Sequence, residues 1–281
     1  MAADGDGAAR AAAFFDLDRT LMQGSSAFQF GRAAYRAGLM SRRQLLADGW
    51  ANLKFRLRGS TDEATHALRG RISESLKGTR VRDMERLGAG VLAGVLPRIY
   101  PQVLAIAHEH QDAGRRAYIT TAASQELAGI LSTVLALDGG IGTQFSEVVD
   151  GVYTGTPTGL FIYGEGKARA IQDLAEREGI DLAESYAYSD SASDLPMLRL
   201  VGHPVVVNPD RELLQVAREE GWGVLRFERL GRRMKALGAL LGAAVAGGLG
   251  SAVVARRREL IAIVRSVRGG RSRAPLRLRQ G

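Results

Sequence analysis

The chain has 281 residues, of which 46% are hydrophobic, so it can form one large domain or two smaller ones around a substantial core. It contains no cysteine, which excludes disulfides and thiolate metal sites and suits a reducing compartment. The first ten residues include acids and no apolar run, so we expect no secretory signal there.

The net charge of +8 is unevenly distributed along the chain. Residues 226–281 hold 14 Lys and Arg against two acids, a net charge of +12, which leaves −4 for residues 1–225. Within that part, residues 24–96 carry +7 and the remainder −11. We therefore do not expect a nucleic-acid partner. An acidic core that holds a cation, beneath a basic segment that attracts an anion, suits a phosphate substrate.

The first acidic motif, Asp16 to Thr20, follows a short apolar run. A buried parallel strand that ends at two carboxylates delivers them to the edge where open α/β sheets bind ligands. Asp16 could attack phosphorus, while Asp18 gives a proton to the leaving oxygen and later takes one from water. The Thr20 hydroxyl could fix the loop. The alternative interpretation is a strand end followed by an Asx-type turn.

Helical periodicity runs from residue 25 to about residue 96, without a convincing strand. Gly38 is placed to end the first helix, Ser41 to cap a second, and residues 60–63 to begin a third. We predict a helical cap at residues 24–96, inserted into a catalytic core made of residues 1–23 and 97–230. The alternative is that these helices only pack on one face of the sheet.

A second strand is predicted over residues 116–121, between helices at residues 100–111 and 125–137. A hydroxyl at the end of this strand, next to a helix N-terminus, is well placed to bind a phosphate oxygen. We choose Thr121 over Thr120 because Thr121 is the last residue before a turn of small residues. Thr is also common at strand ends for reasons of propensity alone.

Residues 148–154 contain Asp-Gly between apolar residues, which predicts a β-hairpin that forms an outlying ribbon. Lys167 then precedes a helix predicted over residues 168–178. The pattern around it does not match a nucleotide-binding phosphate loop, because the first glycine is misplaced and Ala168 stands where Ser or Thr is required. Lys167 is either a solvated charge or the cation that neutralises a transferring phosphoryl group.

A second acidic cluster follows the apolar residues 186–188 and contains Asp190 and Asp194. At the end of a parallel strand, Asp190 could share a cation with Asp16, and Asp194 could support Lys167 or a metal-bound water. Oxygen ligands of this kind favour Mg²⁺ over zinc. Alternatively, Asp190 is a turn residue and Asp194 an N-cap.

Further strands are predicted over residues 205–207 and 224–227, with a helix over residues 212–219 between them. The histidines do not have the spacing of a metal site, and we expect solvated or packing roles for them. They are His66, His108, His110 and His203.

Asp-x-Asp-x-Thr, a strand-end Thr, an isolated Lys and Ser-Asp-x-x-x-Asp occur in one order along the chain. This arrangement resembles the haloacid dehalogenase (HAD) superfamily of phosphohydrolases, and in particular the subfamily of phosphoserine phosphatase and the HAD-IB hydrolases. The resemblance covers about residues 11–225 and implies an α/β fold, a doubly wound parallel sheet with an inserted helical cap.

The resemblance also implies a role for each motif residue. It makes Asp16 the nucleophile and Asp18 the acid and base, with Thr121 and Lys167 on the phosphate. Mg²⁺ would be held by Asp16, the main-chain carbonyl of Asp18, and Asp190, with Asp194 in support. The implied activity is that of a Mg²⁺-dependent phosphatase that forms an aspartyl-phosphate intermediate.

Two departures from phosphoserine phosphatase concern the substrate. The glutamate that grips the amino group in that enzyme would align near Ser25, and its Ser-Gly-Gly turn is here Thr121-Ala122-Ala123. We therefore predict a phosphomonoesterase for a small or lipid-linked phosphate ester, with phosphoserine as the alternative. A membrane-tethered regulatory protein that keeps the fold is the alternative from another class.

Residues 236–255 are uncharged and have arginines on both sides. Their length suits a membrane span, but the many Gly and Ala residues make insertion weak. We expect residues 231–281 to form an apolar, Arg-rich helical tail that attaches a cytoplasmic catalytic domain to an anionic membrane surface. The alternatives are a soluble flexible tail or, less favoured, a nucleic-acid-binding tail.

Overall fold

The structure of the protein is a computed structural model that describes residues 11–38, 40–43 and 62–227, with side chains in the last range from residue 66 onward. By its contacts the chain is one compact unit up to Phe227, and the residues from Glu228 onward form a second unit outside the described part. The predicted tail at residues 231–281, with its membrane attachment, lies outside the description. None of the helices in the described ranges has the length and apolar character needed to cross a bilayer.

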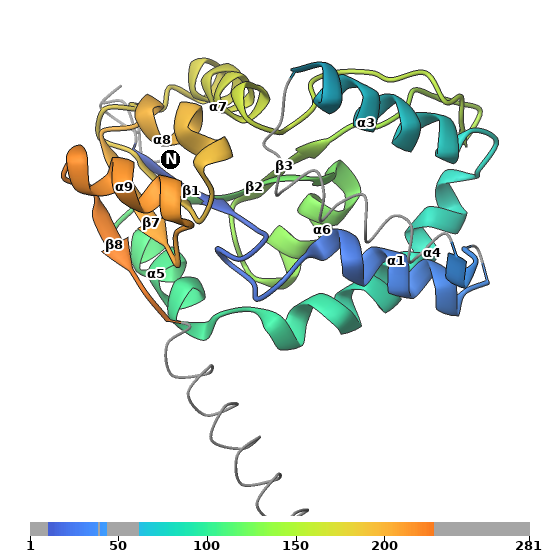
Figure 1. Ribbon diagram of the computed structural model, residues 1–281, viewed down its shortest axis with the longest axis horizontal. Coiled ribbons are helices and arrows are strands. Elements are labelled where there is room, and N and C mark those ends of the chain that lie inside the picture. Colours follow the sequence, from blue (N-terminus) through green and yellow to red (C-terminus); the bar gives the residue numbers. More distant parts are fainter. Residues whose placement is uncertain (1–10, 39, 44–61, 228–281) are drawn as a thin grey trace, which may run out of the picture. The chain divides into compact units, whose positions relative to one another are not determined.

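A six-stranded sheet, in which all neighbouring strands pair in parallel, organises the described chain (Figure 1). The strand order is β3-β2-β1-β6-β7-β8. β1 lies in the interior of the sheet, and the chain moves outward from it in both directions. This arrangement confirms the predicted doubly wound parallel sheet. The strands are β1 (Ala12–Asp16), β2 (Arg116–Ser124), β3 (Gly139–Thr143), β6 (Tyr186–Ser189), β7 (His203–Val207) and β8 (Gly223–Leu225).

Two groups of helices cover the two faces of the sheet (Figure 1). The first group is α5 (Pro101–Asp112) and α6 (Gln125–Val134), and the second is α7 (Glu165–Glu178), α8 (Leu195–Leu200) and α9 (Arg211–Glu219). Each group buries its apolar side chains in a separate hydrophobic cluster. The sheet therefore has no face open to water over its central strands, which explains the continuous apolar runs in the sequence.

Strand β1 is buried along its whole length because it contributes to both clusters. Phe14 stacks on Tyr118 with ring centroids 5.6 Å apart, and Phe15 stacks on Tyr188 on the opposite face at 4.4 Å. Side chains alternate between the faces of a strand, so Asp16 lies on the same face as Phe14. That is the face covered by α7 and α8.

Strand β3 is absent from the sequence prediction because three of its five residues are glycine. These glycines allow helix α6 to approach the strand. A Cβ atom on Gly140 would lie 2.3 Å from the carbonyl oxygen of Ala128, and one on Gly142 would lie 2.7 Å from that of Ser124. Close backbone packing thus replaces the β-branched side chains that usually mark a strand.

Strand β2 is longer than predicted, since it continues from Thr121 to Ser124. The segment was expected to turn directly into a helix. Its pairing with β3 shifts register between Thr120 and Ser124. The predicted turn is therefore an irregularity within the strand and not its end. Ser124 then caps α6 by accepting a hydrogen bond from the main-chain nitrogen of Leu127 at 3.3 Å.

The helical segment between β1 and α5 contains α1 (Ser26–Arg36), α3 (Asp62–Leu76) and α4 (Val81–Val95), followed by a short 3₁₀ helix (Leu96–Arg98). Gly38 has a positive φ just beyond α1, which confirms the predicted end of that helix. The helix that Ser41 was expected to cap lies mostly outside the described residues. The predicted boundaries of the cap, at residues 24 and 96, remain predictions.

The hairpin of β4 (Val148–Val149) and β5 (Val152–Tyr153) is confirmed, and its Asp-Gly turn has positive φ at both residues. It is separate from the main sheet but is not an outlying ribbon. Its second strand bonds with the loop between α3 and α4, where Arg80 bridges to Val152 and Gly78 N donates to Tyr153 O at 2.9 Å. The hairpin therefore joins the helical segment to the core.

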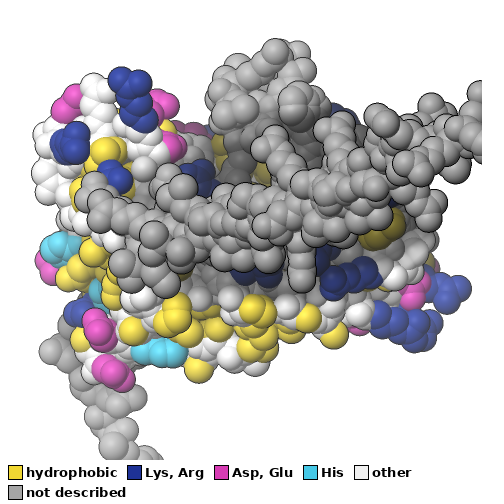
Figure 2. Space-filling view, turned by 60° about the horizontal axis from the view of Figure 1, so that its bottom comes forward, with side chains coloured by type: hydrophobic (Ala, Val, Ile, Leu, Met, Phe, Trp, Pro, Cys, Tyr) yellow, Lys and Arg dark blue, Asp and Glu magenta, His cyan; other side chains and the backbone are white. Residues whose placement is uncertain are grey.

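The end of the molecule with α1 and α4 is rich in positive charge. Figure 2 shows Lys and Arg side chains gathered there, beside a band of hydrophobic side chains on the same face. Arg36, Arg82 and Arg86 are exposed in this part of the chain. The predicted basic segment thus exposes arginines, and its position over an acidic core stays a prediction.

His110, at the end of α5, has the packing role expected for the histidines. Its side chain is 5% exposed, its Nδ1 accepts a hydrogen bond from Arg115 Nε at 2.7 Å, and its Nε2 lies 2.8 Å from the Tyr188 hydroxyl. Because a guanidinium only donates, Nδ1 carries no proton, and the neutral imidazole donates through Nε2. Burial, with the charge of Arg115, lowers the pKa of His110 from 6.5 to about 4.

We predict that His110 makes the stability of the protein depend on pH. Between pH 6.5 and 4 the unfolded chain binds a proton at this position that the folded chain excludes, so the stabilisation is complete above pH 6.5 and is lost as the pH falls toward 4. Urea unfolding at pH 7.5 and pH 5 should show a loss that is larger, by on the order of 1–2 kcal/mol, in the wild type than in His110→Gln. Equal losses in the two proteins would contradict the buried neutral imidazole.

Candidate active site

Two buried carboxylates stand at the ends of neighbouring parallel strands. Asp16 is the last residue of β1, and Asp190 directly follows β6. The two strands pair with Phe15 opposite Tyr188, so both acids lie beyond the same edge of the sheet. Asp16 is 7% exposed and Asp190 is 1% exposed. The structure thus brings together the two acids that the sequence placed 174 residues apart.

Lys167 is buried between two carboxylates and joins the start of α7 to the ends of β1 and β6. Its Nζ lies 2.6 Å from Asp16 Oδ1 and 2.7 Å from Asp194 Oδ2, and its side chain is 4% exposed. The Ser189 hydroxyl donates to the same Asp194 oxygen at 2.6 Å. Lys167 is therefore not a solvated charge, and the Asp194 side chain makes no capping hydrogen bond at the start of α8.

The chain must turn sharply to bring Lys167 into this position. Gly164, directly before α7, has φ 54° and ψ −123°, a conformation that is essentially restricted to glycine. A Cβ atom on Gly166 would lie 1.9 Å from the carbonyl oxygen of Phe161. The two glycines that the sequence places before Lys167 thus shape the turn, while no phosphate loop is formed.

Burial changes the proton affinities of this pair. It raises the pKa of the Asp16 carboxyl from 3.8 to about 7, although the ammonium of Lys167 acts in the opposite direction. Burial alone would lower the pKa of Lys167, but the charges of Asp16 and Asp194 outweigh it and raise that pKa. The lysine therefore stays charged and acts as the counterion of both acids.

Asp18 lies in the loop beyond β1, where the N-terminus of α1 holds its carboxylate. The main-chain nitrogen of Ser26 donates to Oδ1 at 2.8 Å, and the Ser25 hydroxyl donates to Oδ2 at 3.2 Å. Both oxygens are thereby oriented, and the helix dipole favours the charge. Asp18 remains partly exposed, as a group that exchanges protons with a substrate or water requires.

The threonines of the motifs are all buried. Thr121 Oγ1 accepts a hydrogen bond from Ala123 N at 3.1 Å, while the hydroxyls of Thr20 and Thr120 have no hydrogen-bond partner among the described residues. The Thr20 hydroxyl therefore does not fix the loop after β1, contrary to the prediction. Main-chain hydrogen bonds hold this loop, among them one from Leu21 N to Asp16 O at 3.1 Å. Thr120 is opposite Asp16 in the register and shares its face, and the pairing of β2 with β3 shifts register directly after Thr120, so strand alternation does not set the direction of Thr121.

Arg19 is a residue of this loop that the sequence analysis did not assign. Its Nε lies 3.1 Å from Asp190 Oδ2, so it is an ion-pair partner of the second acid. Its position directly after Asp18 places a cation within the acidic motif, and this is the signal that could have identified it.

The predicted metal donors at this end of the strands are of the chemical kind that a small divalent cation prefers. The predicted donors are the carboxylates of Asp16 and Asp190 and the main-chain carbonyl of Asp18, all hard oxygen ligands of the kind that Mg²⁺ prefers. Among the residues with described side chains, no group of three or more His, Cys, Asp or Glu is placed to hold a metal ion. A set of two carboxylates and one carbonyl, completed by water, does not need such a group.

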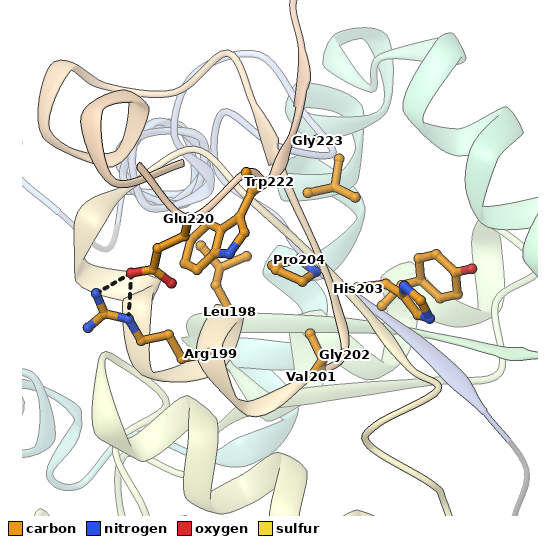
Figure 3. A pocket seen from close by; sticks show the side chains of 12 residues that line it. Leu198, Arg199, Val201, Gly202, His203, Pro204, Glu220, Trp222 and Gly223 are labelled. Atoms are coloured by element: carbon orange, nitrogen blue, oxygen red, sulfur yellow. Dashed lines mark hydrogen bonds and ion pairs between the residues drawn. The ribbon is translucent and has the colours of Figure 1, made fainter. Parts of the chain in front are cut away.

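A separate cavity of about 530 Å³ lies at the other end of the strands, where β6, β7 and β8 begin (Figure 3). Its wall includes the start of β7 at His203, the start of β8 at Gly223, and the indole of Trp222. Arg199 and Glu220 form an ion pair at 2.6 Å on one side of it. Since ligands of open parallel sheets bind at the carboxyl ends of the strands, this cavity is not the site defined by Asp16.

Comparison with known proteins agrees with an α/β hydrolase fold. A model of the haloacid dehalogenase-like hydrolases matches residues 13–199. The chain is 38% identical over 253 residues to a phosphoserine phosphatase, SerB1, of Mycobacterium tuberculosis, covering 89% of this chain and 82% of that protein. It is 39% identical over 137 residues to a histidinol-phosphatase of Neisseria meningitidis, covering 48% and 62%.

A solved structure from Bordetella pertussis, of a protein of unknown function, superposes with a TM-score of 0.68 at 25% identity, covering 78% of this chain and 99% of that one. The chain belongs to the haloacid dehalogenase-like hydrolase family, and it is an enzyme of that class.

We predict that Lys167→Met destabilises the metal-free protein by about 3–5 kcal/mol, because it leaves two buried carboxylates without their counterion. The control is Lys77→Met, which removes a lysine that is 62% exposed and pairs with Glu74, and should change stability by about 0.5 kcal/mol or less. Urea unfolding in the presence of a chelator measures both. A Lys167→Met protein as stable as the control would show that Lys167 does not hold the acids together.

Proposed function

We propose that this hydrolase is a phosphatase that cleaves phosphate monoesters through an aspartyl-phosphate intermediate and requires Mg²⁺. The observation that carries the proposal is the buried contact of Lys167 with Asp16 and Asp194, beside Asp190 on the next strand. A structural ion pair needs neither a second acid beyond the strand end nor a third on the adjacent strand. A site for phosphoryl transfer needs such a set, because charge must be positioned around phosphorus.

The reaction begins when Asp16 attacks phosphorus. A bond forms between a carboxylate oxygen and phosphorus while the bond to the ester oxygen breaks, and Asp18 gives its proton to that leaving oxygen. Asp18 then removes a proton from water, which attacks phosphorus, and the bond to Asp16 breaks to release inorganic phosphate. The ammonium of Lys167 and the Thr121 hydroxyl bind the phosphoryl oxygens throughout.

The metal ligands in this proposal are Asp16, the Asp18 carbonyl and Asp190. A bound Mg²⁺ supplies positive charge that offsets the negative charge of the nucleophile and the phosphate. Asp194 positions Lys167 by accepting a second hydrogen bond from its ammonium, and Ser189 in turn orients Asp194. The lysine is thus aimed at the nucleophile before substrate binds.

For the substrate we propose a small, soluble phosphate ester. The two named relatives act, by their names, on phosphoserine and histidinol phosphate, which both carry an amino group near the phosphate. Ser25, where phosphoserine phosphatase has its amino-binding glutamate, is engaged with Asp18 in this chain. Because of these relatives' names, phosphoserine and histidinol phosphate come first in a substrate panel that also contains lysophospholipid phosphates, the lipid-linked alternative, although the neutral Ser25 counts against phosphoserine.

We predict that Asp16→Asn abolishes Mg²⁺-dependent hydrolysis of p-nitrophenyl phosphate, lowering kcat by about a thousandfold or more, because the amide cannot form the intermediate. The matched control is Asp112→Asn at an exposed position at the end of α5, which should retain wild-type activity. If Asp16→Asn folds normally and keeps its activity, the nucleophile is misassigned, whereas a wild type without phosphatase activity would favour a regulatory role for the fold.

A second pair of variants decides which threonine binds phosphate. Thr121→Val should lower kcat/KM by about a hundredfold, because it removes a donor to the phosphoryl oxygens. Thr120→Val should change kcat/KM by about threefold at most and should not destabilise the protein, since it removes a buried hydroxyl that has no partner among the described residues. Steady-state kinetics and urea unfolding of both variants test this, and the reverse ranking would assign the role to Thr120.

A further inference from the structure

Arg19 has an unusual backbone conformation for its residue type. It lies between Asp18 and Thr20 with a φ of +67°, in the left-handed region that glycine enters without cost and other residues rarely adopt. Two main-chain hydrogen bonds hold the loop around it, from Leu21 to Asp16 and from Met22 to Leu17. The turn therefore directs the Arg19 side chain back across the end of the sheet, at a conformational cost.

The Arg19 side chain reaches Asp190, the acid that directly follows the adjacent strand β6. Arg19 Nε lies 3.1 Å from Asp190 Oδ2, and the Asp190 side chain is 2% exposed while that of Arg19 is 39% exposed. The guanidinium thus approaches a buried carboxylate from the open side of the site. An ionised carboxylate this deeply buried requires a nearby positive charge.

Lys167, a buried cation of the same site, is already committed to other carboxylates. Lys167 contacts Asp16 and Asp194 at 2.6 and 2.7 Å, and neither contact involves Asp190. Asp190 is also one of the two carboxylates proposed to bind Mg²⁺. The contact with Arg19 therefore engages an oxygen of a carboxylate that the metal needs.

We propose that Arg19 is the resident counterion of Asp190 in the metal-free enzyme and that Mg²⁺ displaces it, so that the two cations compete for one carboxylate. This inference rests on the proposed Mg²⁺-dependent function. Arg19 is a positioning residue in this role. When no metal is bound, Arg19 holds the Asp190 carboxylate in place and neutralises its charge. When Mg²⁺ is present, Arg19 competes with the ion and so weakens the affinity of the site for Mg²⁺. Its exposed guanidinium has room to leave without unfolding the loop, because main-chain bonds hold that loop.

The first test is calorimetric titration of the metal-free protein with Mg²⁺. Arg19→Gln should bind Mg²⁺ about three- to tenfold more tightly than the wild type, because no ion pair has to be broken. The control is Arg199→Gln, which breaks the exposed pair with Glu220 at the other end of the strands and should leave the Kd unchanged. An equal Kd for Arg19→Gln and the wild type would overturn the inference and leave the proposed function standing.

The second test needs no variant and follows the displacement itself. The wild-type protein is labelled with phenylglyoxal, an arginine reagent, with and without saturating Mg²⁺, and the modified peptides are quantified by mass spectrometry. Labelling of Arg19 should become several-fold faster with Mg²⁺, while that of Arg199 should not change. Unchanged labelling of Arg19 would mean that it does not leave Asp190. A wild type that binds no Mg²⁺ in the titration would overturn the proposed metal dependence, and the inference with it.

Discussion

The buried ion-pair cluster of Asp16, Lys167 and Asp194 is the constraint on which the rest of the structure depends. Three charged groups have been removed from water at the end of a sheet, which is favourable only if their geometry is tightly held. The lysine meets both acids at 2.6 and 2.7 Å, and a serine hydroxyl orients the second acid. Loss of any one partner leaves a buried charge without compensation. The cluster therefore ties three distant parts of the chain together.

The fold brings these parts together through the order of its strands. β1 and β6 are neighbours in the sheet, although about 170 residues separate them in the sequence, and α7 begins beside their ends. The two faces of β1 are filled by different clusters, so the strand cannot shift without exposing one of them. A rigid strand fixes Asp16, and the more exposed loop beyond it carries Asp18 and Arg19. Burial of the proposed nucleophile and access at the proposed proton donor suit a hydrolase.

The elements with regular apolar patterns could be predicted from the sequence. β1, β6, β7 and the helices after them have their predicted positions within a few residues, because buried parallel strands need apolar runs and helices need their caps and amphipathic spacing. β3 could not be predicted, because its glycines serve the packing of α6 and not strand propensity. The extension of β2 to Ser124 could not be predicted either, because it includes a shift in the register of pairing with β3, a strand distant from the local sequence pattern.

The site residues could be proposed from their motifs, but only some of their contacts could. The sequence predicted that Asp194 supports Lys167 or a metal-bound water, and the tertiary fold shows that Lys167 contacts Asp194 and Asp16. Arg19 and Ser25 were missed as partners of Asp190 and Asp18 because short-range patterns do not reveal which way a loop turns. The left-handed backbone at Arg19 is set by the loop as a whole.

The central claim is that Asp16 and Asp190 converge on one divalent cation in front of a bound phosphate. A crystal structure of the enzyme with Mg²⁺ and a phosphate analogue tests it most directly. The account predicts an ion about 2.0–2.1 Å from a carboxylate oxygen of each acid, with the analogue between that ion, Lys167 and Thr121. An ion bound elsewhere, or an analogue bound away from Asp16, would contradict the account.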